Sequence, residues 1–314
     1  MNLHTNREEF EDLCMLTSQC IGIPVGAVKR DYYIVMLLEN LQNSEYVSEC
    51  VFKGGTSLSK CYPGSINRFS EDIDLTFIPK EKLSGKQYSK KLKKMEQIII
   101  GNANSEKIDS ERNDRNKSSY VWFEEGDIEN SRVKLEIGSS VKPDPYEEKT
   151  LKTYIHEFLE KKDMMDVITE YELESVKINV LSIERTFVDK IFSVKRHAIN
   201  GTINKKVRHI YDVTQLYKMK EIQDFIAHKG TLKELVRKTK ETDLFYLEKR
   251  SIESKYNPLE EYNFNSWKQC FTDDVSVRYE SLHKDLVYGD EKQNFKEAIE
   301  IFKAIGCLFI EINE

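Results

Sequence analysis

Two aspartates, Asp72 and Asp74, stand two residues apart in the stretch RFSEDIDLTF, where polar and apolar residues alternate. This alternation predicts a half-buried strand, in which residues i and i+2 project from the same face. The two carboxylates are then about 7 Å apart at their Cα atoms and repel each other unless a cation or a proton intervenes. Mg²⁺, or Mn²⁺ in its place, is the expected cation, because it takes carboxylate oxygens together with substrate phosphates. A solvated acidic strand face is the alternative interpretation.

A glycine turn precedes this strand. The segment that ends at Lys53 reads as a strand, Gly54 and Gly55 break it, and Thr56 and Ser57 open a predicted short helix. Glycine lets a ligand approach the backbone, and the unpaired N–H groups at a helix start favour an anion. The turn is not a Walker A loop, since G-x-x-x-x-G-K-[ST] is absent, and alone it also fits a simple capped turn. Combined with the acidic strand, it indicates a unit suited to phosphoryl or nucleotidyl transfer.

The elements around these motifs predict an α+β protein with two domains. Lys-Pro-Asp-Pro at 142–145 cannot be helical and marks the expected boundary between domains 1–145 and 146–314. The first domain is expected to hold a mixed sheet flanked by helices, and the second to be mainly helical. The expected strands are 47–53, 72–78, 119–124, 133–137 and 176–181. The expected helices include 25–42, 56–62, a helix running into 95–100, 183–198 and 205–218.

Composition limits the class of protein. The formal net charge of −6 over 314 residues argues against a generally basic nucleic-acid coat but leaves local basic patches open. No apolar run approaches the roughly 20 residues of a membrane helix, and the N-terminus lacks a secretory h-region. The six cysteines form no C-x-x-C motif. A cytoplasmic protein with reduced thiols is therefore expected.

Two lysine- and arginine-rich stretches could contact nucleic-acid phosphates, or could be solvated helix faces. Residues 80–94 contain seven lysines and one glutamate. The second group consists of Lys195, Arg196, Lys205, Lys206 and Arg208.

The motifs G-G-T-S-L-x-K and R-F-S-E-D-I-D-L together resemble the signature of the AbiEii/AbiGii-type nucleotidyltransferase toxins, which include the MenT-like toxins. These belong to the DNA polymerase β-type nucleotidyltransferase superfamily. The resemblance runs from about residue 25 to 78, is looser over 183–216, and does not reach the last hundred residues. It implies a nucleotidyltransferase fold for the N-terminal domain.

The resemblance also implies roles for individual residues. The glycine-hydroxyl turn at 54–57 would grip the β and γ phosphates, and the D-x-D pair would hold the metal. A third carboxylate is assigned to Glu136 in RVKLEIG, although the superfamily usually has aspartate there and an exposed salt-bridging role is equally open. Lys190 and Asp212 match the lysine and aspartate of two later helices, and Asp189 stands where the family usually has glutamate. Lys190 lies at the edge of an apolar stripe, where it must snorkel or meet an anion, and Asp212 is one candidate partner.

The function implied is a metal-dependent toxin that transfers NMP from NTP to RNA, particularly the tRNA 3′ end, and that has a cognate antitoxin. Three alternatives remain open: a small-molecule (antibiotic-type) nucleotidyltransferase, a kinase-like phosphotransferase, and a non-catalytic nucleotide- or partner-binding module. The sequence leaves the nucleotide, the acceptor and the oligomeric state undetermined.

Overall fold

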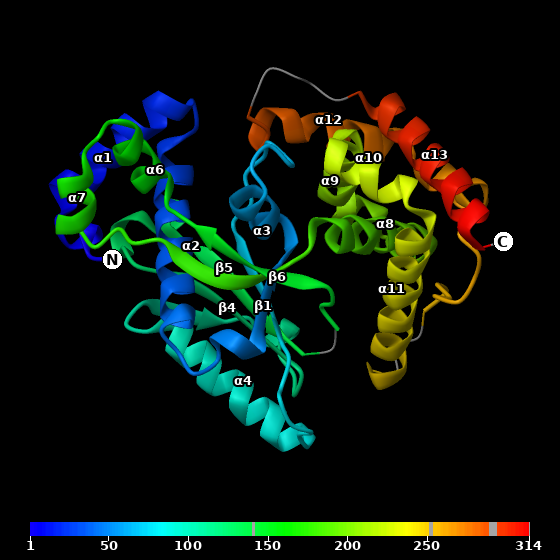
Figure 1. The fold of residues 1–314 in the computed structure, drawn as a ribbon, viewed down its shortest axis with the longest axis horizontal. Helices are drawn as coiled ribbons and strands as arrows, with labels where there is room; N and C mark the ends of the chain where they lie inside the picture. The colour runs from blue at the N-terminus through cyan, green and yellow to red at the C-terminus, as the bar shows by residue number, and fades with distance from the viewer. Residues whose placement is uncertain (140–141, 251–253, 289–293, 314) are drawn as a thin grey trace. The chain divides into compact units, whose positions relative to one another are not determined.

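The computed structural model describes residues 1–139, 142–250, 254–288 and 294–313. They divide into two compact units (Figure 1). Unit 1 comprises Met1–Cys61 and Phe69–Leu181, and unit 2 comprises Tyr62–Arg68 and Ser182–Glu314. This division differs from the predicted boundary at residue 145, because residues 146–181 still belong to unit 1 and add strands to its sheet.

Unit 1 is a mixed sheet with helices. Among its described residues, seven strands follow the order β3-β4-β5-β2-β1-β7-β6, and β2 runs parallel to β5 and antiparallel to β1. Its strands are β1 (Cys50–Lys53), β2 (Asp72–Phe77), β3 (Asn104–Lys107), β4 (Asn116–Trp122), β5 (Val133–Gly138), β6 (Tyr146–Leu151) and β7 (Val176–Leu181). Its helices are α1 (Arg7–Ile21), α2 (Val25–Gln42), α3 (Gly54–Cys61), α4 (Gly85–Ile100), α5 (Ile128–Ser131), α6 (Tyr154–Lys161) and α7 (Met165–Glu170).

The predicted acidic strand is confirmed as β2, and its alternation divides the two faces of the sheet. Ile73, Leu75 and Phe77 are buried on one face, whereas Asp72 and Asp74 lie half-buried on the other. Helices α2 and α4 contact each other and the strands β4, β5 and β7. Burial of the apolar face against such helices fixes the register, because a one-residue slip would send the aspartates into the core.

Two edge strands were not predicted. β3 is exposed throughout and β6 nearly so, and neither shows the apolar alternation that marks a half-buried strand. β6 pairs antiparallel with β7 from Tyr146 to Leu151, which is why unit 1 extends past residue 145. The predicted strand over 47–53 forms only in its second half, since Val47–Glu49 is a 3₁₀ turn.

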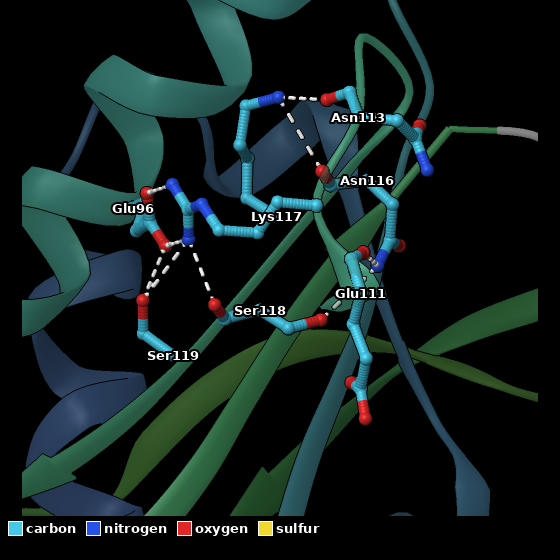
Figure 2. A network of polar contacts seen from close by, with 8 residues as sticks. Glu96, Glu111, Asn113, Asn116, Lys117, Ser118 and Ser119 are labelled. Atoms are coloured by element: carbon cyan, nitrogen blue, oxygen red, sulfur yellow. Dashed lines mark hydrogen bonds and ion pairs between the residues drawn. The ribbon is translucent and has the colours of Figure 1, made fainter. Parts of the chain in front are cut away.

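A buried polar network joins α4 to the sheet (Figure 2). Glu96 of α4 accepts two hydrogen bonds from Arg112, at 2.5 and 2.7 Å, and one from Ser119 of β4 at 2.8 Å. Burial alone would raise the pKa of Glu96, but these donors outweigh it and hold the pKa below its usual value. Lys117 donates to the backbone carbonyls of Asn113 and Asn116, so its buried ammonium is solvated by peptide groups.

Unit 2 is mainly helical. Its helices are α8 (Ile183–Ile199), α9 (Val207–Lys218), α10 (Lys220–Ala227), α11 (Lys229–Arg250), α12 (Asp273–Asp285) and α13 (Phe295–Asn313). The predicted helix start is confirmed, because the Ser182 side chain caps α8 by accepting from the Arg185 N–H at 3.2 Å. The predicted apolar stripe is buried at Ile183, Phe187 and Ile191.

The short segment Tyr62–Arg68 belongs to unit 2, although it lies between α3 and β2 in the sequence. It is attached by an antiparallel bridge between Arg68 and Val287 and by a hydrogen bond from the Tyr288 N–H to the Asn67 carbonyl at 3.0 Å. Among the helices of the described ranges, none is both long and apolar enough to cross a membrane.

Candidate active site

The glycine turn and the acidic strand touch at Gly54 and Asp74. Gly54 has φ +90°, and a carboxylate oxygen of Asp74 occupies the space that a Cβ at this position would need. Glycine is therefore required twice, once for the positive φ and once for the close approach. The predicted phosphate-binding turn and the predicted metal-binding strand thus share one surface of unit 1.

Three charged residues lie side by side on the acidic face of the sheet. Lys53 pairs in register with Asp74 across the β1–β2 ladder, and Asp74 pairs with Glu136 across the β2–β5 ladder. Residues directly opposite on neighbouring strands project from the same face. Asp74 makes no hydrogen bond or ion pair with any described residue, and its half-buried side chain lies against Gly54.

Negative charge exceeds positive charge around Glu136 on this face of the sheet. Burial and the neighbouring Asp74 carboxylate raise the pKa of Glu136, while Lys53 and Lys134 oppose the rise. The Lys134 ammonium is 3.9 Å from Glu136 but lies closer to Glu111, at 2.7 Å. The two neighbouring carboxylates therefore lack a full complement of positive charge.

The hydroxyls of the turn are buried. Ser57 donates to the Gly54 carbonyl at 3.0 Å and is 0% exposed. Thr56 is 1% exposed, and its Oγ1 has no hydrogen-bond partner among the described residues. The exposed donors of the turn are consequently those of the backbone at the start of α3.

A buried ion pair, which no sequence pattern predicted, holds α3 against α2. The Lys60 ammonium lies 2.6 Å from Asp31 Oδ1 and 4.0 Å from the centre of the Tyr154 ring. Asp31 also accepts from the Tyr154 N–H at 2.7 Å. These contacts, together with a small pocket that Thr56 and Arg30 line, connect α2, α3 and the start of α6. They fix the orientation of the helix that begins with the glycine turn.

In unit 2, Asp212 binds two cations. Arg68 donates to it in a bidentate arrangement, with Nε 2.6 Å from Oδ1 and Nη2 2.7 Å from Oδ2. The Lys190 ammonium is 2.8 Å from Oδ2. All three side chains are nearly inaccessible, with Asp212 at 0%, Arg68 at 3% and Lys190 at 6% exposure. The pairing of Lys190 with Asp212, one of the possibilities raised by the sequence, is therefore present.

The two cations keep Asp212 ionised. Burial would raise the pKa of Asp212, but Arg68 and Lys190 outweigh that effect and hold its pKa below the usual value. Glu71, three residues after Arg68 in the sequence, pairs with Arg30 at 2.9 Å.

The second basic stretch is not a continuous basic surface. Lys195 is 1% exposed and donates to the Glu261 carbonyl at 2.9 Å. Arg196 pairs with Asp243 at 2.6 Å. Lys205 and Arg208 are exposed. The interpretation of all five residues as phosphate contacts is therefore wrong at Lys195, because its helical position faces the core.

The comparison with known families identifies the class of protein. The family described as "Nucleotidyl transferase AbiEii toxin, Type IV TA system" matches residues 36–301, which include the turn, the acidic face and the Asp212 cluster. The chain belongs to this family and is a nucleotidyltransferase toxin. Membership implies a nucleoside triphosphate substrate and a cognate antitoxin.

Individual relatives are distant. No curated protein matches the chain in sequence. Among solved structures, the chain is similar to MenT4, a nucleotidyltransferase toxin from Mycobacterium tuberculosis H37Rv, with 16% identity over 94% of this chain and 98% of that one and a TM-score of 0.48. It is also similar to JHP933 from Helicobacter pylori, with 17% identity over 82% and 94% of the two chains and a TM-score of 0.38.

Proposed function

We propose that the protein transfers a nucleoside monophosphate from an NTP to a hydroxyl of RNA, in a reaction that depends on a divalent metal ion. The observation that carries the proposal is the contact between Gly54 and the Asp74 carboxylate. It brings a glycine turn at a helix start and an unpaired carboxylate to one surface, where phosphates and their metal ion are bound together in phosphoryl-transfer sites.

The triphosphate would bind at residues 54–57. The backbone N–H groups of Gly55 and Thr56 lie in the first turn of α3, where they have no intrahelical acceptor. The absence of a side chain at Gly54 leaves room for the Asp74 carboxylate beside the turn. The buried Thr56 hydroxyl lacks a hydrogen-bond partner among the described residues.

The donor set fits a hard divalent cation. In the described part of the chain, no group of three His, Cys, Asp or Glu side chains is arranged to hold a metal by itself. Mg²⁺ and Mn²⁺ do not need such a cage, since one or two carboxylates plus substrate phosphates and water suffice. Asp72 and Asp74 would supply these carboxylates, with Glu136 as the third acidic group. When bound, the metal would polarise the α-phosphate and neutralise the leaving pyrophosphate.

The proposed reaction forms a bond between the acceptor oxygen and the α-phosphorus and breaks the bond to the β-phosphate, which leaves in pyrophosphate. The acceptor hydroxyl loses a proton, and Glu136 or Asp74 would accept it. Glu136 suits this role because burial and the neighbouring Asp74 carboxylate raise its pKa, which favours acceptance of a proton.

Lys190 would place positive charge on the triphosphate, as the resemblance implies. Asp212 is fully buried and already holds Arg68 and Lys190, so we assign it to positioning rather than to contact with substrate.

The acceptor would be RNA, and the tRNA 3′ end is the specific proposal. Lys86, Lys90 and Lys93 occur at i, i+4 and i+7 on α4 and are exposed. The described residues offer none of them an ion pair. Residues at this spacing share one helix face, so three uncompensated ammonium groups would contact successive phosphates.

The test is incubation of the full chain with total RNA, Mg²⁺ and NTPs labelled at either the α- or the γ-phosphate. We expect α-label on RNA, release of pyrophosphate, and loss of both in Asp72→Ala and Asp74→Ala. Transfer of γ-label would identify a phosphotransferase, α-label on small molecules alone would identify a different acceptor class, and no transfer by the folded protein would contradict catalysis.

A further inference from the structure

Lys53 is the last residue of β1 and immediately precedes the glycine turn. Its position on the sheet is fixed by the β1–β2 ladder, in which it lies directly opposite Asp74. Lys53 therefore projects from the same face as Asp74 and its other neighbour, Glu136. The Lys53 residue is half-buried rather than enclosed.

Lys53 and Asp74 do not form an ion pair, although they are opposite in charge and adjacent in register. Asp74 turns its carboxylate over Gly54, into the space of a missing Cβ. Among the described residues, Lys53 has no hydrogen bond or ion pair of its own. A lysine that only balanced the charge of the carboxylates would be expected to form an ion pair with one of them. Lys134 does so with Glu111, where the ammonium lies 2.7 Å from a carboxylate oxygen.

We propose that Lys53 contacts the phosphates of the bound nucleotide directly. This inference rests on the proposed function, because it assigns the triphosphate to residues 54–57. A ligand seated on that turn meets Lys53 on the strand side and Asp74 beside it. Lysine binds phosphate as a point charge and needs no fixed geometry, which suits a side chain at the edge of a turn.

The inference predicts opposite effects on two ligands. Pyrophosphate carries the phosphate groups without a base or sugar, so loss of the Lys53 charge should weaken its binding. A divalent cation held by Asp72 and Asp74 is repelled by the same charge, so its binding should be unchanged or tighter.

The experiment is isothermal titration of the full chain with pyrophosphate in the absence of metal, and separately with Mn²⁺ alone. We compare wild type with Lys53→Met, Lys53→Arg and the control Lys177→Met, which removes an exposed lysine of β7 in the same sheet. For Lys53→Met we expect the pyrophosphate Kd to rise about tenfold, the equivalent of about 1.4 kcal/mol, with Mn²⁺ binding retained. Lys53→Arg should recover most of the affinity, and Lys177→Met should behave as wild type.

Equal pyrophosphate affinity in wild type and Lys53→Met would overturn the inference while leaving the proposed function intact. Parallel loss of pyrophosphate and Mn²⁺ binding in Lys53→Met would also overturn it, since that pattern indicates a structural defect. Failure of the wild-type protein to bind pyrophosphate or to transfer a nucleotide would instead contradict the proposed function itself.

Discussion

The carboxylate of Asp74 lies against the backbone of Gly54, with its carboxyl carbon 3.3 Å from the position that a Cβ on Gly54 would take. This contact explains why one short sequence combines a bare turn with an acidic strand. β1 and β2 are antiparallel neighbours, and the turn that follows β1 brings its glycine to the aspartate near the start of β2. Any side chain at Gly54 must move the carboxylate.

Gly54→Ala should therefore abolish most activity. The added Cβ displaces Asp74, and misplacement of a reacting group by about 1 Å can cost about 100-fold in rate. Gly22→Ala is the matched control, because Gly22 also has a positive φ, of 71°, but a Cβ there meets no atom within 4 Å. Both variants should lose about 1–2 kcal/mol of stability from backbone strain, whereas only Gly54→Ala should lose activity in a nucleotide-transfer assay. Full activity of folded Gly54→Ala would contradict the assigned position of Asp74.

Asp212→Asn should destabilise unit 2. It removes the carboxylate charge that the buried Arg68 and Lys190 share, and removal of one partner of a buried pair costs about 3–5 kcal/mol. Glu297→Gln is the control, since the exposed Lys218–Glu297 pair, 2.8 Å apart, should contribute less than about 1 kcal/mol. Chemical unfolding measures both changes. An Asp212→Asn protein as stable as Glu297→Gln would show that the cluster is not buried as described.

Lys190→Met separates stability from function in the same cluster. The bidentate Arg68–Asp212 pair remains intact and neutral, so the loss of stability should be smaller than in Asp212→Asn. If Lys190 neutralises the triphosphate, nucleotide transfer should still fall by about 100-fold or more. Wild-type transfer rates in Lys190→Met would remove this residue from the proposed site.

Most of the fold that positions the site followed from local patterns. The acidic strand alternates polar and apolar residues, and helix α8 follows the capping residue Ser182, so both could be located from the sequence. β3 and β6 could not be located from the sequence, because edge strands that are exposed on both sides carry no periodic apolar signal. Because β6 was not predicted, the expected domain boundary was placed at residue 145, before this strand.

The pairing of distant residues was less accessible to sequence reasoning. Lys190 and Asp212 were proposed as partners from their helical positions. Arg68 was not placed with them, because the return of the segment 62–68 to unit 2 depends on its bridge to Val287. The Asp31–Lys60 pair was missed for the same reason: a buried charge is apparent only once the helix that covers it is known.

The stability of unit 2 should depend on pH through Lys195. Burial, and secondarily Lys240, lower the pKa of Lys195 to about 8, whereas the unfolded chain titrates near 10.4. Between these values the unfolded state binds more protons, so folding becomes more favourable as pH rises from about 8 to 10, by at most about 3 kcal/mol. Urea unfolding of wild type and Lys195→Met between pH 7 and 9.5 measures this, with Lys177→Met as the control. A difference between the two proteins that does not change with pH would contradict it.

The lysines of α4 should set the salt dependence of RNA binding. Each phosphate contact contributes about 0.7 to the slope of log K against log salt for single strands and about 0.9 for duplexes. The triple variant Lys86→Gln, Lys90→Gln, Lys93→Gln should therefore lower the slope by about 2–3 in fluorescence-anisotropy titrations. The double variant Lys229→Gln, Lys303→Gln changes exposed lysines that already pair with Glu311 and Glu300, and should leave the slope unchanged. Equal slopes in the α4 variant and wild type would exclude this helix as the RNA contact.

Sequencing of tRNA 3′ ends after incubation with the full chain, all four NTPs and Mg²⁺ examines the role of the acidic face and the choice of acceptor together. Wild type and Asp166→Ala, which removes an exposed aspartate of α7, should extend the 3′ ends by added nucleotides. Asp74→Ala should reduce this addition by at least about 1,000-fold, because it removes a carboxylate that acts on the reacting phosphate. Addition by Asp74→Ala at the wild-type rate, or unextended RNA with folded and nucleotide-bound wild type, would contradict nucleotide transfer to RNA at this site.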